Sequence, residues 1–342
     1  MERRLELVKK IAPDLTEEMV KRYRILKAVR LLQPCGRRML VLSLGMTERT
    51  VRSEIERLNA QKLIHISKIG MNLTADGMEV LEGLEDIFAE LMGLSVLERR
   101  LEKLLGVEKV LVAQGNSDEN ERAKKEMGQL AARVLSERIS KEMCIAIAGG
   151  TAMAELVEAI PDMSVPMAKM VVPARGSIGR RLELQADTLA ARLAEKLQAE
   201  YRLLHLPDNL SPYVLEEMKK EPDVAETMAE MNRAQILLLG VGNAAEMAEK
   251  RRLDDGIRKQ LQKDGAVAEA CGYYFDGKGK VIYETRSIGI DWKEMQKMKH
   301  IIIVAGGQKK AESLLAVSHS IPKGIFVTDE GAAFKLLRLA GK

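Results

Sequence analysis

Glycine and hydroxyl residues follow one of the apolar segments in the middle of the chain. The segment 144–148 runs into Gly149, Gly150, Thr151 and Ala152, where a helical pattern begins. Two glycines let the backbone come close to an anion, and the first N–H groups of a helix have no partner within it. The Thr151 hydroxyl is a further donor. The pattern predicts a loop that can hold a phosphate group.

Cationic residues follow other apolar segments that have the character of strands. The cations are Arg175, Lys250, Arg251 and Lys310. Ligands bind at the carboxyl ends of the strands in a parallel sheet, so we expect these side chains at one rim. Several cations from separate strands favour a ligand with two phosphates. The chain has no Walker A sequence, and its 240–242 glycine pair lacks the third glycine of a dinucleotide fingerprint.

Carboxylates near the same segments leave an enzyme as the alternative, namely a sugar-phosphate isomerase or deaminase-like protein with an added DNA-binding domain. An isomerase needs a carboxylate base held over the sugar, usually with an acid partner. The candidate carboxylates are Glu269, Asp254, Asp255, Asp329 and Glu330. The sequence places none of them over a substrate, and Cys144 lies in an apolar strand. We therefore expect a regulator with no catalytic residues.

Cysteine and histidine spacing predicts neither a metal site nor a disulfide framework. The three cysteines and four histidines are scattered, and no CxxC pair occurs. We therefore expect no metal and no cofactor.

The first 80 residues have the pattern of a winged helix-turn-helix. We expect helices over 16–32, with Thr16 as N-cap, over 39–44, and from Thr47 onward, followed by a hairpin over 63–73 as the wing. The outward side of the third helix and the wing carry residues of the types that contact phosphates and base edges. The expected DNA contacts are Arg49, Thr50, Arg52, Ser53, Arg57 and Lys68.

The distribution of charge supports operator DNA as a partner of this part. Residues 1–80 contain 16 Lys and Arg against 10 Asp and Glu, whereas the rest of the chain contains 38 against 40. A basic domain joined to a slightly acidic one indicates that the first part meets a polyanion.

The length of 342 residues predicts two domains or three. We expect a DNA-binding domain over 1–80, a helical linker over 81–105 and an effector-binding domain over 106–342. The leucines of the linker fit pairing with a second chain or packing on the following domain equally well. No apolar run reaches the roughly 18 residues of a membrane helix, and no secretory signal precedes the chain, so we expect a cytoplasmic protein.

Beyond residue 106, short apolar runs alternate with longer amphipathic segments. This alternation predicts an α/β fold of the Rossmann-like kind, with a mostly parallel sheet covered on both faces. The expected strands are 110–112, 145–148, 170–172, 201–206, 235–240, 301–304 and 325–327.

The combination resembles the SorC/DeoR-type sugar-responsive transcriptional regulators. The resemblance covers essentially the whole chain and includes AGGT at 148–151, VPARG at 172–176 and VTDEGAA at 327–333. It implies a bacterial repressor of an operon for triose-phosphate glycolytic enzymes, with fructose 1,6-bisphosphate as effector. It also implies an effector domain similar in fold to sugar-phosphate isomerases that has lost catalysis.

The resemblance further assigns the effector contacts. They are Gly149, Gly150, Thr151, Ala152, Arg175, Gln185, Lys250, Arg251, Glu269 and Lys310. Two positions depart from the family pattern, because Ala152 often is a second threonine and Lys250 stands in place of arginine, which can bind a phosphate through two N–H groups. A homodimer or a homotetramer is expected. The sequence does not decide between them, nor whether the effector lowers DNA affinity or loosens contacts between dimers.

Overall fold

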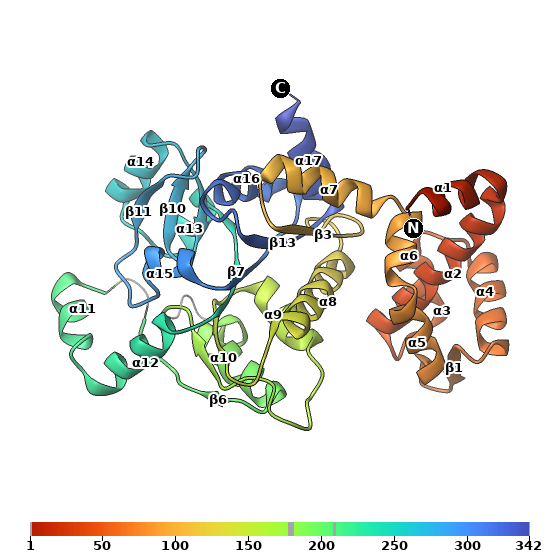
Figure 1. The fold of residues 1–342 in the computed structure, drawn as a ribbon, viewed down its shortest axis with the longest axis horizontal. Coiled ribbons are helices and arrows are strands. Elements are labelled where there is room, and N and C mark those ends of the chain that lie inside the picture. The colour runs from red at the N-terminus through yellow and green to blue at the C-terminus, as the bar shows by residue number, and fades with distance from the viewer. Residues whose placement is uncertain (1, 177–180, 208–209, 342) are drawn as a thin grey trace. The chain divides into compact units, whose positions relative to one another are not determined.

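The chain folds into two compact units, residues 1–97 and 98–342 (Figure 1). The computed structural model describes residues 2–176, 181–207 and 210–341. The division falls within the segment that the sequence marks as a linker, and each unit has a hydrophobic core of its own.

The first unit is helical apart from one hairpin, as predicted. Its elements are α1 (Glu2–Ile11), α2 (Pro13–Leu32), α3 (Arg37–Leu44), α4 (Glu48–Ala60), β1 (Ile64–Ser67), β2 (Gly70–Leu73), α5 (Ala75–Gly83) and α6 (Glu85–Leu91). Buried residues of α2 and α4, such as Ile25 and Ile55, share one core with Phe88 of α6. The ring of Phe88 stacks on Tyr23 at 4.0 Å between centroids. Helix α6 therefore belongs to this unit.

Helix α2 begins earlier than expected. Pro13 occupies its first turn, where a residue without an N–H group is tolerated, and Thr16 is buried inside the helix. The Thr16 hydroxyl donates to the carbonyl oxygens of Ala12 and Pro13 instead of capping a helix end. The prediction of Thr16 as N-cap was wrong.

The expected hairpin forms between β1 and β2. The strands pair antiparallel, with Ile64 opposite Leu73 and Ser67 opposite Gly70. A backbone bridge between Cys35 and Met71 ties the hairpin to the turn before α3. Together with α2, α3 and α4, this hairpin makes the unit a winged helix-turn-helix.

The second unit contains a seven-stranded parallel sheet of order β3-β13-β12-β7-β4-β5-β6. Its strands are β3 (Lys109–Ala113), β4 (Cys144–Ile147), β5 (Met170–Pro173), β6 (Glu200–Tyr201), β7 (Ile236–Gly240), β12 (His300–Val304) and β13 (Gly324–Asp329). Six of the seven expected strands form at the predicted positions, whereas the strand expected over 201–206 is reduced to β6, which has two residues. Every pair of neighbouring strands in this sheet is parallel.

Helices cover both faces of this sheet. The helices of the unit are α8 (Glu121–Arg138), α9 (Thr151–Ala159), α10 (Ala186–Leu197), α11 (Pro212–Met218), α12 (Pro222–Asn232), α13 (Ala244–Lys250), α14 (Asp255–Lys263), α15 (Trp292–Lys297), α16 (Ala311–Ser320) and α17 (Glu330–Ala340). Ile145 and Ile147 pack with α8, α9 and α10, while the intervening Ala146 is also fully buried. Burial of successive positions is what a sheet covered on both sides requires.

The second unit also contains an antiparallel sheet, which the sequence analysis did not predict. It has the order β11-β10-β9-β8, formed by β8 (Gly242–Asn243), β9 (Ala266–Ala270), β10 (Tyr273–Asp276) and β11 (Val281–Glu284). It follows directly from β7 through β8, so it lies beside the carboxyl ends of the parallel strands.

Helix α7 (Leu94–Leu105) closes the outer edge of the parallel sheet. The Glu98 carboxylate accepts from the N–H of Val112 at 2.9 Å, and Glu102 accepts from Val110 at 3.1 Å. These two N–H groups lie on the side of β3 that has no neighbouring strand in the sheet. Two carboxylates of a helix thus take the part of a neighbouring strand and block pairing at the edge.

Candidate functional site

The predicted effector contacts lie in the segments that follow β4, β5, β7 and β12. We call these segments the rim of the second unit. Strands β4 and β7 are neighbours, and the chain leaves them toward opposite edges of the sheet. This is a topological switch point, where ligands of open α/β sheets bind.

The glycine loop after β4 is built for a close approach of backbone to backbone. A Cβ on Gly149 would lie 2.6 Å from the carbonyl oxygen of Leu184, and Gly150 has a φ of +124°. The N–H of Gly150 donates to that same oxygen, which brings the buried Gln185 next to the loop. Thr151 then starts α9 with an exposed side chain, and Ala152 follows it half-buried. The open donors of the loop therefore begin at the N-terminus of α9.

Arg175, after β5, is only 5% exposed and is held by the antiparallel sheet. Its guanidinium donates to the carbonyl oxygen of Cys271 and, at 2.6 Å, to the hydroxyl of Thr285. A Cβ at Gly272 would overlap the guanidinium, so glycine is required there. Thr285 has no distinguishing pattern in the sequence, because its role depends on a sheet that the sequence did not predict.

Arg251 and Glu269 form a buried ion pair at the same rim. The Nη2 and Oε1 atoms are 2.6 Å apart, and the side chains are 2% and 4% exposed. Glu269 also accepts from the backbone N–H of Gly272, next to Arg175. Breaking such a pair leaves a buried charge uncompensated, so both residues are fixed in place. Glu269 therefore orients Arg251.

Lys310 is the cation of the rim with the most unusual surroundings. Burial, and next the positive charge of Lys250, lower the pKa of the Lys310 ammonium. Among the described residues, its side chain has no hydrogen-bond acceptor and no ion pair. Lys250 is exposed, and the charges of Glu246 and Asp118 oppose the shift of Lys310. A bound anion would stabilise the charged form of Lys310.

Two of the five acidic residues that were candidates for catalysis, Asp329 and Glu330, bind backbone N–H groups. Asp329 is fully buried and accepts from the N–H groups of Ser117, Gly307 and Ala332 at 2.7–2.8 Å. Glu330 accepts from Gly115, and the exposed Asp255 pairs with Arg258. The side chain of Asp254 makes no cap hydrogen bond at the start of α14.

The remaining reactive group gives no nucleophile. Burial raises the pKa of the Cys144 thiol to about 12, so the thiol stays protonated near neutral pH. Groups of three or more His, Cys, Asp or Glu that could hold a metal ion are not found in the part of the chain that the structure describes.

Helix α4 presents the predicted DNA contacts of the first unit. Thr47 caps it by accepting from the N–H of Thr50 at 3.2 Å, and its apolar side is buried. Arg49, Arg52 and Ser53 are exposed. Arg52 pairs with Glu56 one turn on, at 3.0 Å, where both side chains are more than half exposed and the pair is weak.

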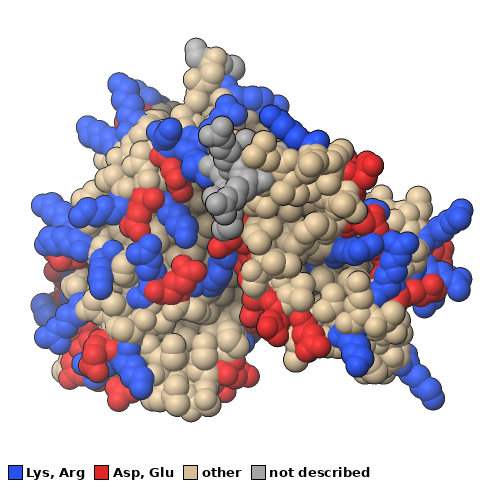
Figure 2. Space-filling model, turned by 45° about the vertical axis from the view of Figure 1, so that its right-hand side comes forward, with Lys and Arg blue, Asp and Glu red and all other residues tan. Residues whose placement is uncertain are grey.

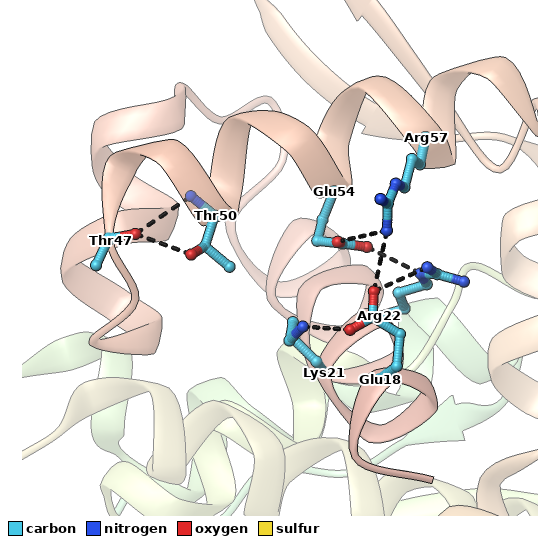
Figure 3. A network of polar contacts seen from close by, with 7 residues as sticks. All are labelled: Glu18, Lys21, Arg22, Thr47, Thr50, Glu54 and Arg57. Carbon is cyan, nitrogen blue, oxygen red and sulfur yellow. Dashed lines mark hydrogen bonds and ion pairs between the residues drawn. The ribbon is translucent and has the colours of Figure 1, made fainter. Parts of the chain in front are cut away.

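Two further predicted contacts, Thr50 and Arg57, also have partners within the unit. The hydroxyl of Thr50 bonds to that of Thr47 at 2.8 Å, and the Arg57 guanidinium lies between the carboxylates of Glu18 and Glu54 (Figure 3). Lys68 is exposed at the turn of the hairpin.

The sequence analysis did not single out Arg37 and Arg38, which are exposed in the first turn of α3. The signal in the sequence was that two neighbouring arginines follow Pro34 and Gly36, at the start of a helix. Figure 2 shows Lys and Arg side chains projecting from this unit, on the right of the view, with some Asp and Glu among them.

Comparison with known proteins decides the family. Residues 89–338 match the family described as "Putative sugar-binding domain", and residues 19–88 match the CggR N-terminal DNA binding domain. The chain is 38% identical to the central glycolytic genes regulator of Priestia megaterium over 98% of each chain. The identity to the regulator of the same name from Bacillus subtilis is also 38%, over 99% of each. The chain belongs to the SorC family of sugar-binding transcriptional regulators.

Solved structures of SorC-family proteins agree with this fold. A crystal structure described as a "putative SorC family transcriptional regulator" from Enterococcus faecalis is 30% identical and has a TM-score of 0.65, covering 70% of this chain and 99% of that one. The full-length sorbitol operon regulator SorC from Klebsiella pneumoniae has a TM-score of 0.68 at 20% identity, over 89% of this chain and 94% of the other.

The family also answers the question of an enzyme. The relatives from Priestia megaterium and Bacillus subtilis are named as regulators of glycolytic genes, so this SorC-family chain is a regulator and not an isomerase or deaminase. None of the helices in the described ranges has the length and apolar character needed to cross a bilayer.

Proposed function

We propose that this SorC-family regulator represses a glycolytic operon and is released from operator DNA by fructose 1,6-bisphosphate. The near full-length identity to two central glycolytic genes regulators supports the choice of operon. We place the protein in the cytoplasm, where it reaches that operon.

The rim supports a ligand with two phosphate groups. One anion site would be the N-terminus of α9 at Thr151, where N–H groups and a hydroxyl are open. The other would use Lys310, whose pKa is lowered by burial, together with the exposed Lys250. Arg175 and the Arg251–Glu269 pair lie at the same rim, where their partners fix them in place.

A homodimer or homotetramer would bind DNA, because one winged helix reads too few base pairs for strong specificity. Operators should therefore contain two half-sites. Analytical ultracentrifugation on operator DNA should find at least two protomers at saturation; a single protomer would contradict this part of the proposal.

A gel shift with DNA from upstream of a glycolytic operon tests the main claim. Fructose 1,6-bisphosphate should weaken binding, and a tenfold change corresponds to about 1.4 kcal/mol of coupling. A parallel assay should find no turnover of the sugar. Absence of any effect of the sugar on DNA binding, together with no heat of binding in calorimetry, would overturn the choice of effector.

The variant Thr151→Glu sharpens this test, since it places a negative charge at the first turn of α9. It should keep operator binding in the absence of sugar and lose release by the sugar. The control Ser136→Glu alters α8 at an exposed site that is not part of the rim, and it should respond as wild type. Release of Thr151→Glu at the wild-type sugar concentration would remove this loop from the site.

A further inference from the structure

An ion-pair network joins α2 to the recognition helix α4 (Figure 3). Glu54, on the inner side of α4 and 5% exposed, accepts from Arg22 Nε at 2.8 Å and from Arg57 Nη1 at 3.2 Å. Glu18 of α2 accepts from Arg22 at 2.8 Å and from Arg57 at 3.1 Å, and it also pairs with Lys21. Two carboxylates therefore hold three cations, of which only Arg57 lies on α4.

Arg57 belongs to the exposed row of α4. It lies four residues after Ser53 and eight after Arg49, a spacing that places all three on one side of a helix. The Arg57 side chain is 54% exposed, yet its guanidinium is turned toward α2. Arg49 of the same row has no ion-pair or hydrogen-bond partner for its side chain among the residues that the structure describes. Before DNA binds, Arg57 is therefore held in ion pairs, whereas Arg49 on the same face of α4 is not.

The partners of Arg57 do not have the same function. Glu54 is buried and already bound by Arg22, so this pair secures α4 on α2 whether or not Glu18 is present. Glu18 is half-buried on α2, and the hydrogen bond and charge of Lys21 lower the pKa of its carboxyl, so Glu18 remains ionised. Loss of the Glu18 charge would leave the helix contact intact and would free one side of the Arg57 guanidinium.

We propose that Glu18 is a positioning residue that limits the affinity of the regulator for DNA, by holding Arg57 in an ion pair that a DNA phosphate must displace. This inference rests on the proposed DNA-binding function. A cation that is paired with a carboxylate gains less from meeting a phosphate than a free cation, because it must first lose its partner. Phosphate contacts do not depend on the DNA sequence, so Glu18 should lower the affinity for operator DNA and for other DNA alike.

The test compares Glu18→Gln with Glu17→Gln in the full chain. Both changes remove one negative charge from α2, but Glu17 is exposed, and neither an ion pair nor a hydrogen bond of its side chain is found among the described residues. The probe is a random-sequence DNA duplex, whose binding is followed by fluorescence anisotropy over a range of salt concentrations. Glu18→Gln should bind about threefold to tenfold more tightly than Glu17→Gln, with a salt slope steeper by about 0.9, the value for one more phosphate contact.

A double-variant cycle assigns the effect to Arg57. In the Arg57→Gln background, Glu18→Gln should bind DNA no more tightly than Glu17→Gln. Thermal unfolding of every variant checks that α4 stays folded. Equal affinities and equal slopes for the two single variants would overturn the proposal, and so would an advantage of Glu18→Gln that persists without Arg57. Weaker binding by Glu18→Gln would show that Glu18 presents Arg57 to DNA, which is the opposite role. Failure of the wild-type chain to bind any DNA would refute the proposed function itself.

Discussion

Single residues of the rim differ in whether their charge is already compensated. The charge of Arg251 is compensated by the carboxylate of Glu269, and Arg175 donates to two neutral groups, the Thr285 hydroxyl and the Cys271 carbonyl. For Lys310, burial and then Lys250 lower the pKa, against the effect of Glu246 and Asp118. A lysine whose pKa is lowered gains most from a bound anion, because the anion stabilises its charged form.

From the lowered pKa of Lys310 we predict that the protein takes up a proton when the ligand binds. The pKa of Lys310 is lowered in the free protein, and a bound phosphate should raise it toward the ordinary lysine value of about 10.4. Between those two values, fructose 1,6-bisphosphate should bind with uptake of a proton by Lys310. Above about pH 8 the sugar phosphates are fully ionised and contribute no proton of their own, so the uptake is measured there.

Calorimetry in two buffers of different ionisation enthalpy measures this uptake. Lys310→Met should abolish the uptake and weaken sugar binding about tenfold or more, as expected for loss of a charged hydrogen bond. The matched control is Lys309→Met, at an exposed neighbouring position, which should behave as wild type. Unchanged proton uptake in Lys310→Met would show that another group titrates.

Among the helices and strands, the sequence predicted those whose residue pattern lies within the element itself. Apolar runs such as 301–304 and 325–327 became strands because five or six buried residues in a row fit only the inside of a parallel sheet. The third helix of the DNA-binding unit followed from its Thr47 cap and its apolar period.

Elements whose stability depends on distant partners escaped prediction. The antiparallel sheet β8–β11 has short strands with mixed polarity, and β9 carries Glu269, which is tolerated only because Arg251 lies next to it. In the candidate site, residue types and the order of the strands predicted that the cations and the glycine loop lie at one rim; their contact with an effector stays a prediction. The sequence could not show that Asp329 and Glu330 hold backbone N–H groups, because residue type does not distinguish a carboxylate that caps loops from one that acts as a base.

The contact of α7 with the sheet edge predicts a pH effect on stability. Burial raises the pKa of Glu98, more than the hydrogen bond from Val112 lowers it; Glu102 adds to the rise, and Arg133 and Lys109 oppose it. The folded state thus binds the Glu98 proton more tightly than the unfolded state does. The contribution of Glu98 to stability is then fully present below the unfolded value of about 4.3 and falls as pH rises through the raised value.

The variant Glu98→Gln does not titrate at this position but can still accept from Val112. Its stability relative to wild type should therefore increase between about pH 4 and pH 7. Urea unfolding followed by the fluorescence of Trp292, the only tryptophan, reports on the second unit. The exposed control Glu195→Gln should show no such trend. A relative stability of Glu98→Gln that stays constant over this range would contradict the assignment.

At the scale of the whole molecule, α7 decides where the chain can be divided. The boundary between the compact units, at residues 97 and 98, falls inside this helix. Leu91 lies in the core of the first unit, whereas the carboxylates of Glu98 and Glu102 bind the edge strand of the second. Leu101 and Leu105 are buried within the single chain. This favours intrachain packing for the linker leucines over pairing with a second chain.

A fragment of residues 93–342, which keeps the whole of α7, should consequently be more stable than a fragment of residues 106–342. Removal of α7 leaves the N–H groups of Val110 and Val112 without acceptors, at about 1.5–3 kcal/mol for each charged hydrogen bond, and uncovers a strand edge that can pair with another molecule. Unfolding followed by Trp292 fluorescence should give a lower midpoint for 106–342, and light scattering should detect its association. Because both fragments retain every residue of the rim, fructose 1,6-bisphosphate should bind each one that folds. Equal midpoints and a monodisperse 106–342 would show that α7 serves only as a connection between the units.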